Sequence, residues 1–344
     1  MLGTLRLILA LMVAYSHAGH FMFGLNPGVS AVVVFYLISG YVMAGLIARH
    51  YDSPRKAGGF YADRAMRLLP QYYFVAGITL AWYFVARPEN YYLAHTPTGT
   101  DLINNLLIVP LNYFMWNESN RFVLIPPAWS LGAEIQFYLL APLLLHRRLP
   151  VVLTGIASLC VYCLALTGKI NSDWFGYRLL PGALSFFLCG ALLFHLHRTN
   201  KGAATVFAFA VPFLVATGAV ILGKTGTLTL PYNRETLLGL LAGVPLIHWL
   251  ATQRRQMWDE RLGDLSYGVF LNHFLILWTL FPAGVPFDQL PWFLGASLVL
   301  SAIVQRTVER PFLAWRLSLR STGHQSFGTA DLTRPGESRN KMHS

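Results

Sequence analysis

Long runs without charged side chains alternate with short polar segments along most of this chain. From Leu7 to Ala48 there is no Asp, Glu, Lys or Arg. A helix that spans a bilayer needs about 20 residues, so this run predicts two helices with a turn at Asn26-Pro27-Gly28 between them. Eight further runs are similarly poor in charge: Leu68–Ala86, Phe122–Leu145, Leu149–Gly168, Leu179–Phe194, Gly202–Gly223, Thr236–Gln253, Leu265–Phe287 and Gln289–Gln305.

These runs predict an all-α, polytopic integral membrane protein with about ten transmembrane helices. Pro282, Gly284 and Pro286 interrupt one run, so its helix is expected to end near Phe281. The composition agrees, because 55% of the 344 residues are hydrophobic and 12% are charged, against about 25% charged in soluble proteins. A disordered chain, a collagen and a disulfide-stapled secreted domain are excluded, and a soluble enzyme is disfavoured.

The charges that remain are mostly basic, with 26 Lys and Arg against 15 Asp and Glu. Ten helices would place both termini on one side of the membrane. On that assignment the side with the termini holds 20 of the 26 basic residues and the opposite side holds six. Basic loops stay in the cytoplasm, so both termini are predicted to be cytoplasmic. The basic surplus therefore indicates topology, and we expect no nucleic-acid partner.

The two ends of the chain need separate interpretations. Arg6, the apolar run Leu7–Ala14 and Ser16-His17-Ala18 have some features of a signal peptide. A histidine at the cleavage junction is atypical, so we interpret this segment as a retained first helix. The tail is rich in Gly, Ser, Asn and basic residues, as is typical of disorder. We predict a transmembrane domain over residues 1–321 and a disordered polar cytoplasmic tail over residues 322–344.

Ionisable side chains inside spans are costly and are candidates for function. Arg6 and His17 lie on one face of the first predicted helix, about 16 Å apart along its axis. His17 is expected deep in the bundle, and histidine exchanges protons near neutral pH. His20 completes an H-x-x-H pattern, but no carboxylate or Cys accompanies it in the span. Cys160 and Cys163 likewise lack partners, so no metal site is expected.

Arg64 and Arg67 lie one turn apart at the cytoplasmic start of the third predicted helix. Two guanidinium groups on one face suit a phosphate group, although they equally suit a plain membrane anchor. Glu134 is the only acidic residue well inside a predicted span, where a carboxylate must be paired or protonated. His273 lies about two turns into the ninth predicted helix. Glu309 near the end of the tenth suits either a salt bridge or a functional role.

Six landmarks resemble the acyltransferase family 3, bacterial membrane O-acyltransferases that modify sugars and some macrolides. In chain order they are Arg-x10-His (Arg6, His17), Gly-Val…Phe-Phe-x-x-Ser-Gly-Tyr (Gly28–Tyr41), Arg-x-x-Arg-x-x-Pro (Arg64, Arg67, Pro70), Trp-Ser-Leu-x-x-Glu-x-x-Phe-Tyr (Trp129–Tyr138), Gly-x-x-Ser-Tyr-x-x-x-Leu-x-His (Gly263–His273) and Glu-x-Pro (Glu309, Pro311). This chain has Phe35-Tyr36 at the Phe-Phe pair. No segment corresponds to the extracytoplasmic hydrolase-like domain of some longer members, so we expect a stand-alone membrane transferase.

The resemblance implies an acyltransferase that moves an acyl group, usually acetyl, from cytoplasmic acyl-CoA to a hydroxyl group. Acyl-CoA is then a co-substrate, no cofactor is expected to be bound permanently, and the location is the bacterial cytoplasmic (inner) membrane. Arg6, Arg64 and Arg67 would hold the CoA phosphates. His17 would act as general base or carry the acyl group briefly, and Glu134 would orient its imidazole. Candidates for contacting the substrate or the oxyanion are Ser39, Tyr41, Trp129, Ser130, Tyr267 and His273.

Several alternatives stay open at this stage. Buried His and Glu also build the proton relays of transporters, although transport needs neither the arginine pair nor the ordered motifs. A different acyl donor such as succinyl-CoA, or a macrolide acceptor, would use the same fold. Aromatic residues over residues 87–127 are compatible with a carbohydrate acceptor on the cell surface or in secreted material. The sequence does not decide the oligomeric state.

Overall fold

The structure is a computed structural model that describes residues 2–88, 90–254 and 256–312. Within these ranges the regular structure is helical, and the only β-pairings are two isolated bridges. The predicted tail at 322–344 lies outside the described residues, as do Arg255, Arg316 and Arg320, three of the basic residues behind the predicted topology. The predicted all-α fold is confirmed for the part of the chain that is described.

Each predicted run overlaps a long helix. These helices are α1 (Gly3–His17), α2 (Pro27–His50), α3 (Ala57–Ala86), α6 (Ala128–Leu144), α7 (Arg148–Leu166), α8 (Leu180–Thr199), α9 (Lys201–Lys224), α10 (Asn233–Thr252), α11 (Met257–Leu280) and α12 (Leu290–Val304). The turn between the first two is where it was expected, because Asn26 caps α2 and Pro27 is its first residue. The helix expected to end near Phe281 ends at Leu280. The helices α3, α6 and α11, however, begin 6 to 11 residues from the starts of their runs.

Shorter helices connect these elements. They are α4 (Gly99–Leu107), α5 (Phe114–Asn117), η1 (Pro54–Lys56), η2 (Val109–Tyr113), η3 (Ser119–Arg121), η4 (Trp174–Arg178), η5 (Thr227–Thr229), η6 (Phe287–Gln289) and η7 (Gln305–Glu309). In the described ranges, seven helical segments are long and apolar enough to cross a membrane. The protein is therefore an all-helical membrane protein.

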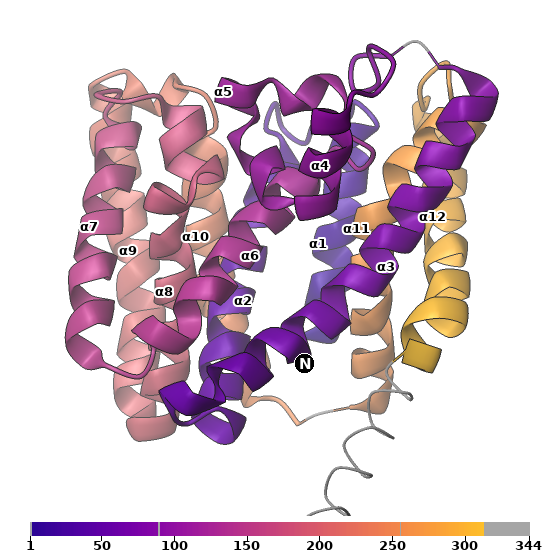
Figure 1. The fold of residues 1–344 in the computed structure, drawn as a ribbon. Helices are drawn as coiled ribbons and strands as arrows, with labels where there is room; N and C mark the ends of the chain where they lie inside the picture. Colours follow the sequence, from indigo (N-terminus) through magenta and orange to yellow (C-terminus); the bar gives the residue numbers. More distant parts are fainter. Residues whose placement is uncertain (1, 89, 255, 313–344) are drawn as a thin grey trace, which may run out of the picture.

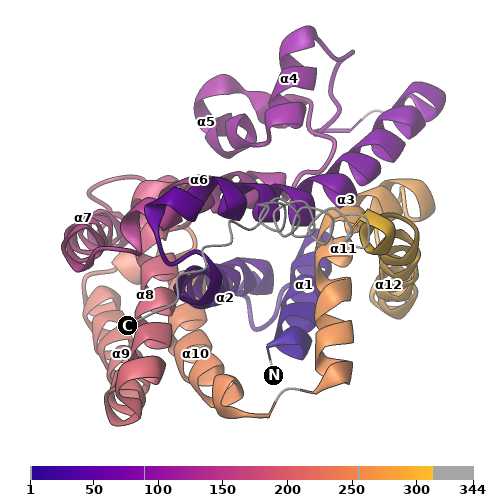
Figure 2. The same cartoon turned by 60° about the horizontal axis from the view of Figure 1, so that its bottom comes forward.

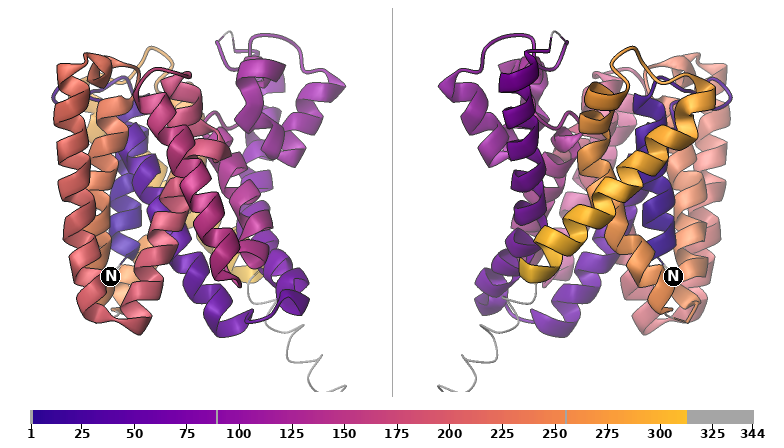
Figure 3. Two further views of the ribbon diagram at one scale, coloured as in Figure 1. Left: turned by 90° about the vertical axis from the view of Figure 1, so that its left-hand side faces the viewer. Right: turned by 90° about the vertical axis from the view of Figure 1, so that its right-hand side faces the viewer.

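The long helices run between two ends of one bundle. Figure 1 shows α7, α8, α9 and α10 together on one side, α3, α11 and α12 on the other, and α1 and α2 between them. The side views in Figure 3 show that α12 crosses the bundle obliquely. Both α4 and α5 lie at the end opposite the N-terminus, and Figure 2 shows them projecting beyond α3 and α6.

Glycines allow α2 and α8 to touch through their backbones. A Cβ atom added at Gly40 would lie 1.8 Å from the carbonyl oxygen of Phe187, and one added at Gly190 would lie 1.9 Å from that of Leu37. No side chain can adopt either separation, so only glycine permits this approach. The Ser-Gly-Tyr motif of the sequence therefore contains a packing residue at Gly40.

A polar contact fixes α1 against α11 at the end with the N-terminus. The carboxylate of Asp259 accepts hydrogen bonds from the backbone N–H of Gly3 at 3.0 Å and of Thr4 at 2.8 Å. It thereby satisfies unpaired donors at the start of α1, where a negative charge also stabilises the helix dipole. One turn further on, Gly263 meets Gly3 so closely that an added Cβ would lie 2.7 Å from its Cα.

The segment from residue 87 to 127 packs on α3. The hydroxyl of Tyr72 donates to the carbonyl of Asn105 at 2.8 Å, which ties α4 to α3. Thr98 and Asp101 form a capping box at the start of α4, and His95 contacts the same carboxylate at 2.9 Å. Burial opposes ionisation of Asp101, but the hydrogen bonds from Thr98 and His95 outweigh it and lower the pKa of this carboxyl group.

Candidate active site

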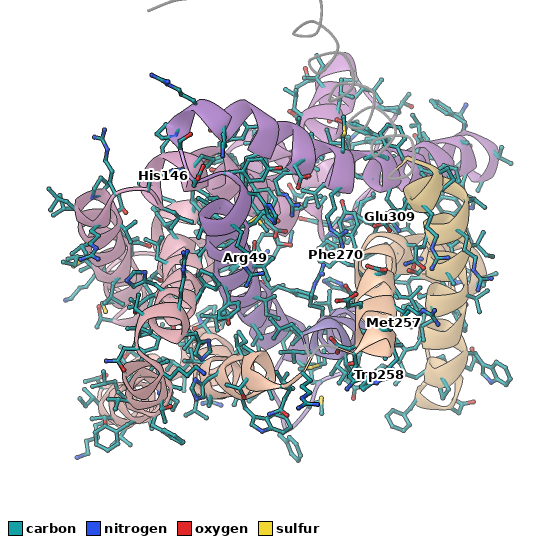
Figure 4. The ribbon with its side chains drawn as sticks, turned by 90° about the horizontal axis from the view of Figure 1, so that it is seen from below. Arg49, His146, Met257, Trp258, Phe270 and Glu309 are labelled. Carbon is teal, nitrogen blue, oxygen red and sulfur yellow. The ribbon has the colours of Figure 1, made fainter. Side chains whose placement is uncertain are left out.

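Two cavities lie one above the other inside the bundle. The first, of about 140 Å³, is lined by Arg6, Arg64 and Arg67 and is called the arginine cavity. The second, of about 280 Å³, is lined by His17 near the opposite end of α1 and is called the histidine cavity. Val32, Ser130 and Phe270 line both cavities and so form the junction between them. Figure 4 looks into the bundle from the end with the N-terminus, with Phe270 and Glu309 labelled beside the opening between α2, α3 and α11.

His17 is hydrogen-bonded to a second histidine. Its Nδ1 lies 2.9 Å from Nε2 of His273, and the two rings are nearly parallel, with an interplanar angle of 3° and centroids 5.1 Å apart. His273 is fully buried, and its Nδ1 lies 2.9 Å from the carbonyl oxygen of Val269. His17 is the last residue of α1, and His273 is in the middle of α11. Both histidines were candidates from the sequence, but no sequence pattern predicted that they pair.

The carbonyl of Val269 fixes the protonation pattern of the neutral pair. A carbonyl oxygen only accepts, so Nδ1 of His273 carries the proton and its Nε2 is an acceptor. His17 must then donate from Nδ1, which leaves Nε2 of His17 with a free lone pair. No described residue forms a hydrogen bond with that Nε2 atom, and His17 lines the histidine cavity. The arrangement thus presents a base to the cavity and holds it in one tautomer.

The three arginines predicted to act together converge on the arginine cavity from α1 and α3. Arg6 forms no hydrogen bond or ion pair with any residue that the structure describes. Arg67 approaches Asp264 and Glu309 only at 3.9 and 3.8 Å. Arg64 pairs with Asp63 at 2.5 Å, and its buried Nε has no described partner. Guanidinium groups with unused donors are suited to phosphate.

Glu134 is not brought to His17, contrary to the expectation that it orients the imidazole. It lines the arginine cavity, where its Oε1 accepts hydrogen bonds from Ser39 Oγ at 2.7 Å and from Tyr138 Oη at 2.5 Å. Arg6 supplies a nearby positive charge. The expected pairing was wrong because α1 runs past both cavities. His17, the last residue of α1, lines the histidine cavity, whereas Glu134 lines the arginine cavity.

The remaining candidate residues separate into four groups. Ser39 and Tyr267 line the arginine cavity, Trp129 lines the histidine cavity, and Ser130 lies at the junction. The hydroxyls of Tyr267 and Ser130 donate to the carbonyls of Leu68 and Pro127. Tyr41 lines neither cavity, because its hydroxyl is bonded to Nδ1 of His197 at 2.9 Å. It is therefore not placed to contact an oxyanion.

Two side chains at these cavities, Arg178 and Tyr36, were not expected from the sequence to be functional. Arg178 lines the histidine cavity, although on charge alone it had been counted only as a basic residue of a connecting segment. Tyr36 lines the arginine cavity, and its buried hydroxyl has no partner in the described part of the chain. The sequence signal for Tyr36 was its place in the Phe-Phe pair of the second motif. Arg178 carried no such signal.

Comparison with known proteins places this arrangement in a family. The family model for the acyltransferase domain matches residues 2–305, nearly the whole of the described chain. The chain belongs to the acyltransferase family 3. It is an enzyme, an acyltransferase of groups other than aminoacyl groups, and the resemblance noted in its six motifs is confirmed.

Relatives of this acyltransferase support O-acyl transfer. It is 24% identical to nodulation protein 10 of Rhizobium leguminosarum bv. viciae, with 92% of this chain and 93% of the relative aligned. It is 23% identical to the putative peptidoglycan O-acetyltransferase YrhL of Bacillus subtilis, with 88% of this chain and 52% of the relative aligned. An uncharacterized protein of Aquifex aeolicus is 38% identical over 54% of this chain and 82% of its own length. No solved structure matches the acyltransferase.

Proposed function

We propose that this acyltransferase moves an acetyl group from cytoplasmic acetyl-CoA to a hydroxyl of a cell-surface or secreted carbohydrate. The observation that carries the proposal is the His17–His273 pair beside the junction of the two cavities. His17, a base fixed in one tautomer, lines the histidine cavity. The arginine cavity is lined by three arginines that suit the phosphates of CoA. Relatives named as O-acetyltransferases support acetyl as the acyl group. Succinyl transfer and a macrolide acceptor are the competing versions of the same chemistry.

The orientation is part of the proposal. We place the protein in the bacterial inner membrane with ten crossings and both termini in the cytoplasm. Arg6 is near the start of α1 and His17 is its last residue, so the arginine cavity lies toward the end with the N-terminus. Acyl-CoA then enters from the cytoplasm, and the acceptor reaches the histidine cavity from the other side. The basic loops expected in the cytoplasm support this direction.

The reaction follows from the protonation of the histidine pair. Nε2 of His17 removes the proton of the acceptor hydroxyl as its oxygen attacks the thioester carbonyl. The resulting imidazolium keeps its Nδ1–H bond to Nε2 of His273, whose own Nδ1–H bonds the carbonyl of Val269. Collapse of the tetrahedral intermediate breaks the C–S bond, and the leaving thiolate takes the proton from His17. The products are an O-acyl ester and free CoA.

The acyl group must pass the junction to reach His17. In this scheme Arg6, Arg64 and Arg67 hold the phosphates while the thioester end extends past Val32, Ser130 and Phe270. Glu134 acts through Ser39 and Tyr138, whose hydroxyls it orients, and through the charge of Arg6. Its proposed role is therefore to organise the path of the acyl donor rather than to support the base.

Two measurements test the proposed function. Surface and secreted glycans from cells with and without the gene are compared by mass spectrometry, and a shift of one acetyl unit is expected. Membranes from the same cells are given labelled acetyl-CoA, and release of free thiol is followed. His17→Ala should abolish both signals while the protein still inserts at the normal level. Unchanged acetylation in His17→Ala cells would exclude the role of this base.

A further inference from the structure

Arg178 is held rigidly at the wall of the histidine cavity. It is the last residue of η4, and its carbonyl accepts a hydrogen bond from Nδ2 of Asn112 at 3.0 Å. Its Nε donates to Oδ1 of Asp173 at 2.5 Å. The side chain of Arg178 is 15% exposed and that of Asp173 is 25% exposed. A largely buried arginine is thus fixed through its backbone and through one edge of its guanidinium group.

Aromatic rings fix the plane of the same group. The guanidinium carbon lies 4.6 Å from the ring centre of Trp129, 5.0 Å from Tyr177, 5.3 Å from Phe114 and 5.7 Å from Tyr232. All four rings also line the histidine cavity. Arg178 and these rings are called the Arg178 box. Such contacts are attractive and leave the hydrogen-bond donors of arginine at its edge.

That edge has unused donors. Nη1 and Nη2 of Arg178 have no hydrogen-bond acceptor among the residues that the structure describes. Arg178 lines the histidine cavity, and neither Nη atom is among the fully buried atoms that lack a partner. These N–H donors are therefore accessible and available to a ligand in the cavity. The same cavity contains His17, whose imidazole interacts electrostatically with Arg178. Arg178 and His17 thus line one cavity, the one in which the acceptor is proposed to bind.

The charge of the site favours a neutral ligand. Asp173 offsets the positive charge of Arg178, so an anionic ligand would meet a carboxylate beside the guanidinium. A neutral polyol instead accepts hydrogen bonds from Nη1 and Nη2 and stacks its C–H face on the rings. We propose that the Arg178 box binds a neutral sugar ring and presents one of its hydroxyls to Nε2 of His17. The proposal rests on the proposed function and makes Arg178 the residue that selects the acceptor.

The test uses two oligosaccharide probes on the full-length protein in detergent, cellotetraose as the neutral probe and tetragalacturonate as the acidic one. Binding is measured by the change in tryptophan fluorescence, and acetyl transfer by release of CoA from acetyl-CoA. The wild-type protein should bind and acetylate cellotetraose in preference to tetragalacturonate. Tighter binding of tetragalacturonate, or binding of neither probe, would overturn the proposal.

Variants separate acceptor binding from catalysis. Arg178→Gln should raise the dissociation constant and KM for cellotetraose roughly tenfold to hundredfold, with kcat and the KM for acetyl-CoA little changed. Arg178→Lys should behave similarly, because it keeps the charge and loses the planar fork. Asp173→Asn should strengthen binding of tetragalacturonate. A drop in kcat with unchanged acceptor KM in both Arg178 variants would mean that the arginine acts on the reaction instead.

The matched control is Arg87→Gln, which removes an exposed arginine that lies over the ring of Phe84 at 5.7 Å and lines neither cavity. It should leave both probes and both KM values unchanged. Binding of acetyl-CoA by the Arg178 variants reports that they are folded. Failure of the proposed function is recognised separately, because the wild-type protein would then release no CoA and alter no glycan. If only this inference fails, the wild-type protein still acetylates its acceptor, and the Arg178 variants bind the acceptor as tightly as the wild-type protein does.

Discussion

Nδ1 of His17 lies 2.9 Å from Nε2 of His273, at the opposite end of the α1–α11 contact from the bond between Gly3 and Asp259. His17 follows Gly3 and His273 follows Asp259 by the same 14 residues, about 21 Å of helix. The two helices therefore run parallel and in register. The anchor at one end and the glycine contact at Gly263 set the position of the histidine pair at the other.

We expect His273→Ala to lower acyl transfer about a hundredfold with little effect on the KM for acyl-CoA. The variant removes the acceptor that holds Nδ1–H of His17, so the base loses its fixed tautomer and the partner of its charged form. Initial rates of CoA release give the measurement. The control is His20→Ala, because His20 bonds the carbonyl of Val285 and lines neither cavity. Equal rates in His273→Ala and the wild-type protein would show that the pair is only structural.

The double variant Arg64→Ala/Arg67→Ala is expected to raise the KM for acyl-CoA at least tenfold and that for the acceptor much less. Both arginines line the arginine cavity, and charge-assisted bonds to phosphate supply much of the donor affinity. Steady-state kinetics with each substrate varied in turn give the comparison. A control that removes exposed cations is Arg55→Ala/Lys56→Ala. Equal increases in both KM values would argue against a CoA site.

The sequence predicted the helices better than it predicted the contacts of the site. Apolar runs of sufficient length, and the turn residues Asn26 and Pro27, depend on local chemistry and place the elements correctly. The partner of His17 depends instead on how α1 and α11 meet across 256 positions of the chain. Glu134 seemed the natural partner because it was the only acidic residue deep in a predicted span. The structure places the carboxylate of Glu134 in the arginine cavity, away from His17 in the histidine cavity. The spacing of residues along the chain does not show that the two side chains lie in different cavities.

Gly40→Ala is expected to destabilise the protein strongly, by about 3 kcal/mol or more. The added methyl group would lie 1.8 Å from the backbone of Phe187, so α2 and α8 would have to separate. The matched control is Gly77→Ala within α3, where no neighbour lies within 4 Å of an added Cβ. That variant should be neutral or slightly stabilising. Thermal unfolding of the purified variants is monitored by size-exclusion chromatography after heating. Similar melting temperatures for Gly40→Ala and Gly77→Ala would contradict the packing argument.

The α4 segment should lose order in acid. The pKa of Asp101 is lowered in the folded state, so ionised Asp101 contributes stability that is complete above its ordinary pKa of about 3.9 and is lost as the pH falls through the folded value. The protection factors for hydrogen exchange over residues 95–107, which are relative to the intrinsic rate at each pH, should therefore fall below about pH 4. Asp101→Asn should remove this acid step and weaken protection at neutral pH. Asp52→Asn is the control, since its carboxylate pairs with Lys56 far from α4. An unchanged acid step in Asp101→Asn would assign the transition to another group.

Phe270 lies at the connection between the cavities, because it lines both of them together with Val32 and Ser130. A larger ring at this position fills the junction, so Phe270→Trp should bind acyl-CoA and acceptor normally and yet transfer the acyl group at least tenfold more slowly. Phe270→Leu, which leaves the junction open, should retain most of the activity. Binding of each substrate is measured alone, and transfer is measured with both present. The two cavities would be functionally independent if Phe270→Trp transferred at the wild-type rate. If Phe270→Trp lost acyl-CoA binding to the same extent as it lost transfer, the larger ring would be acting on the arginine cavity. The proposal that the two substrates meet at this junction would then be contradicted.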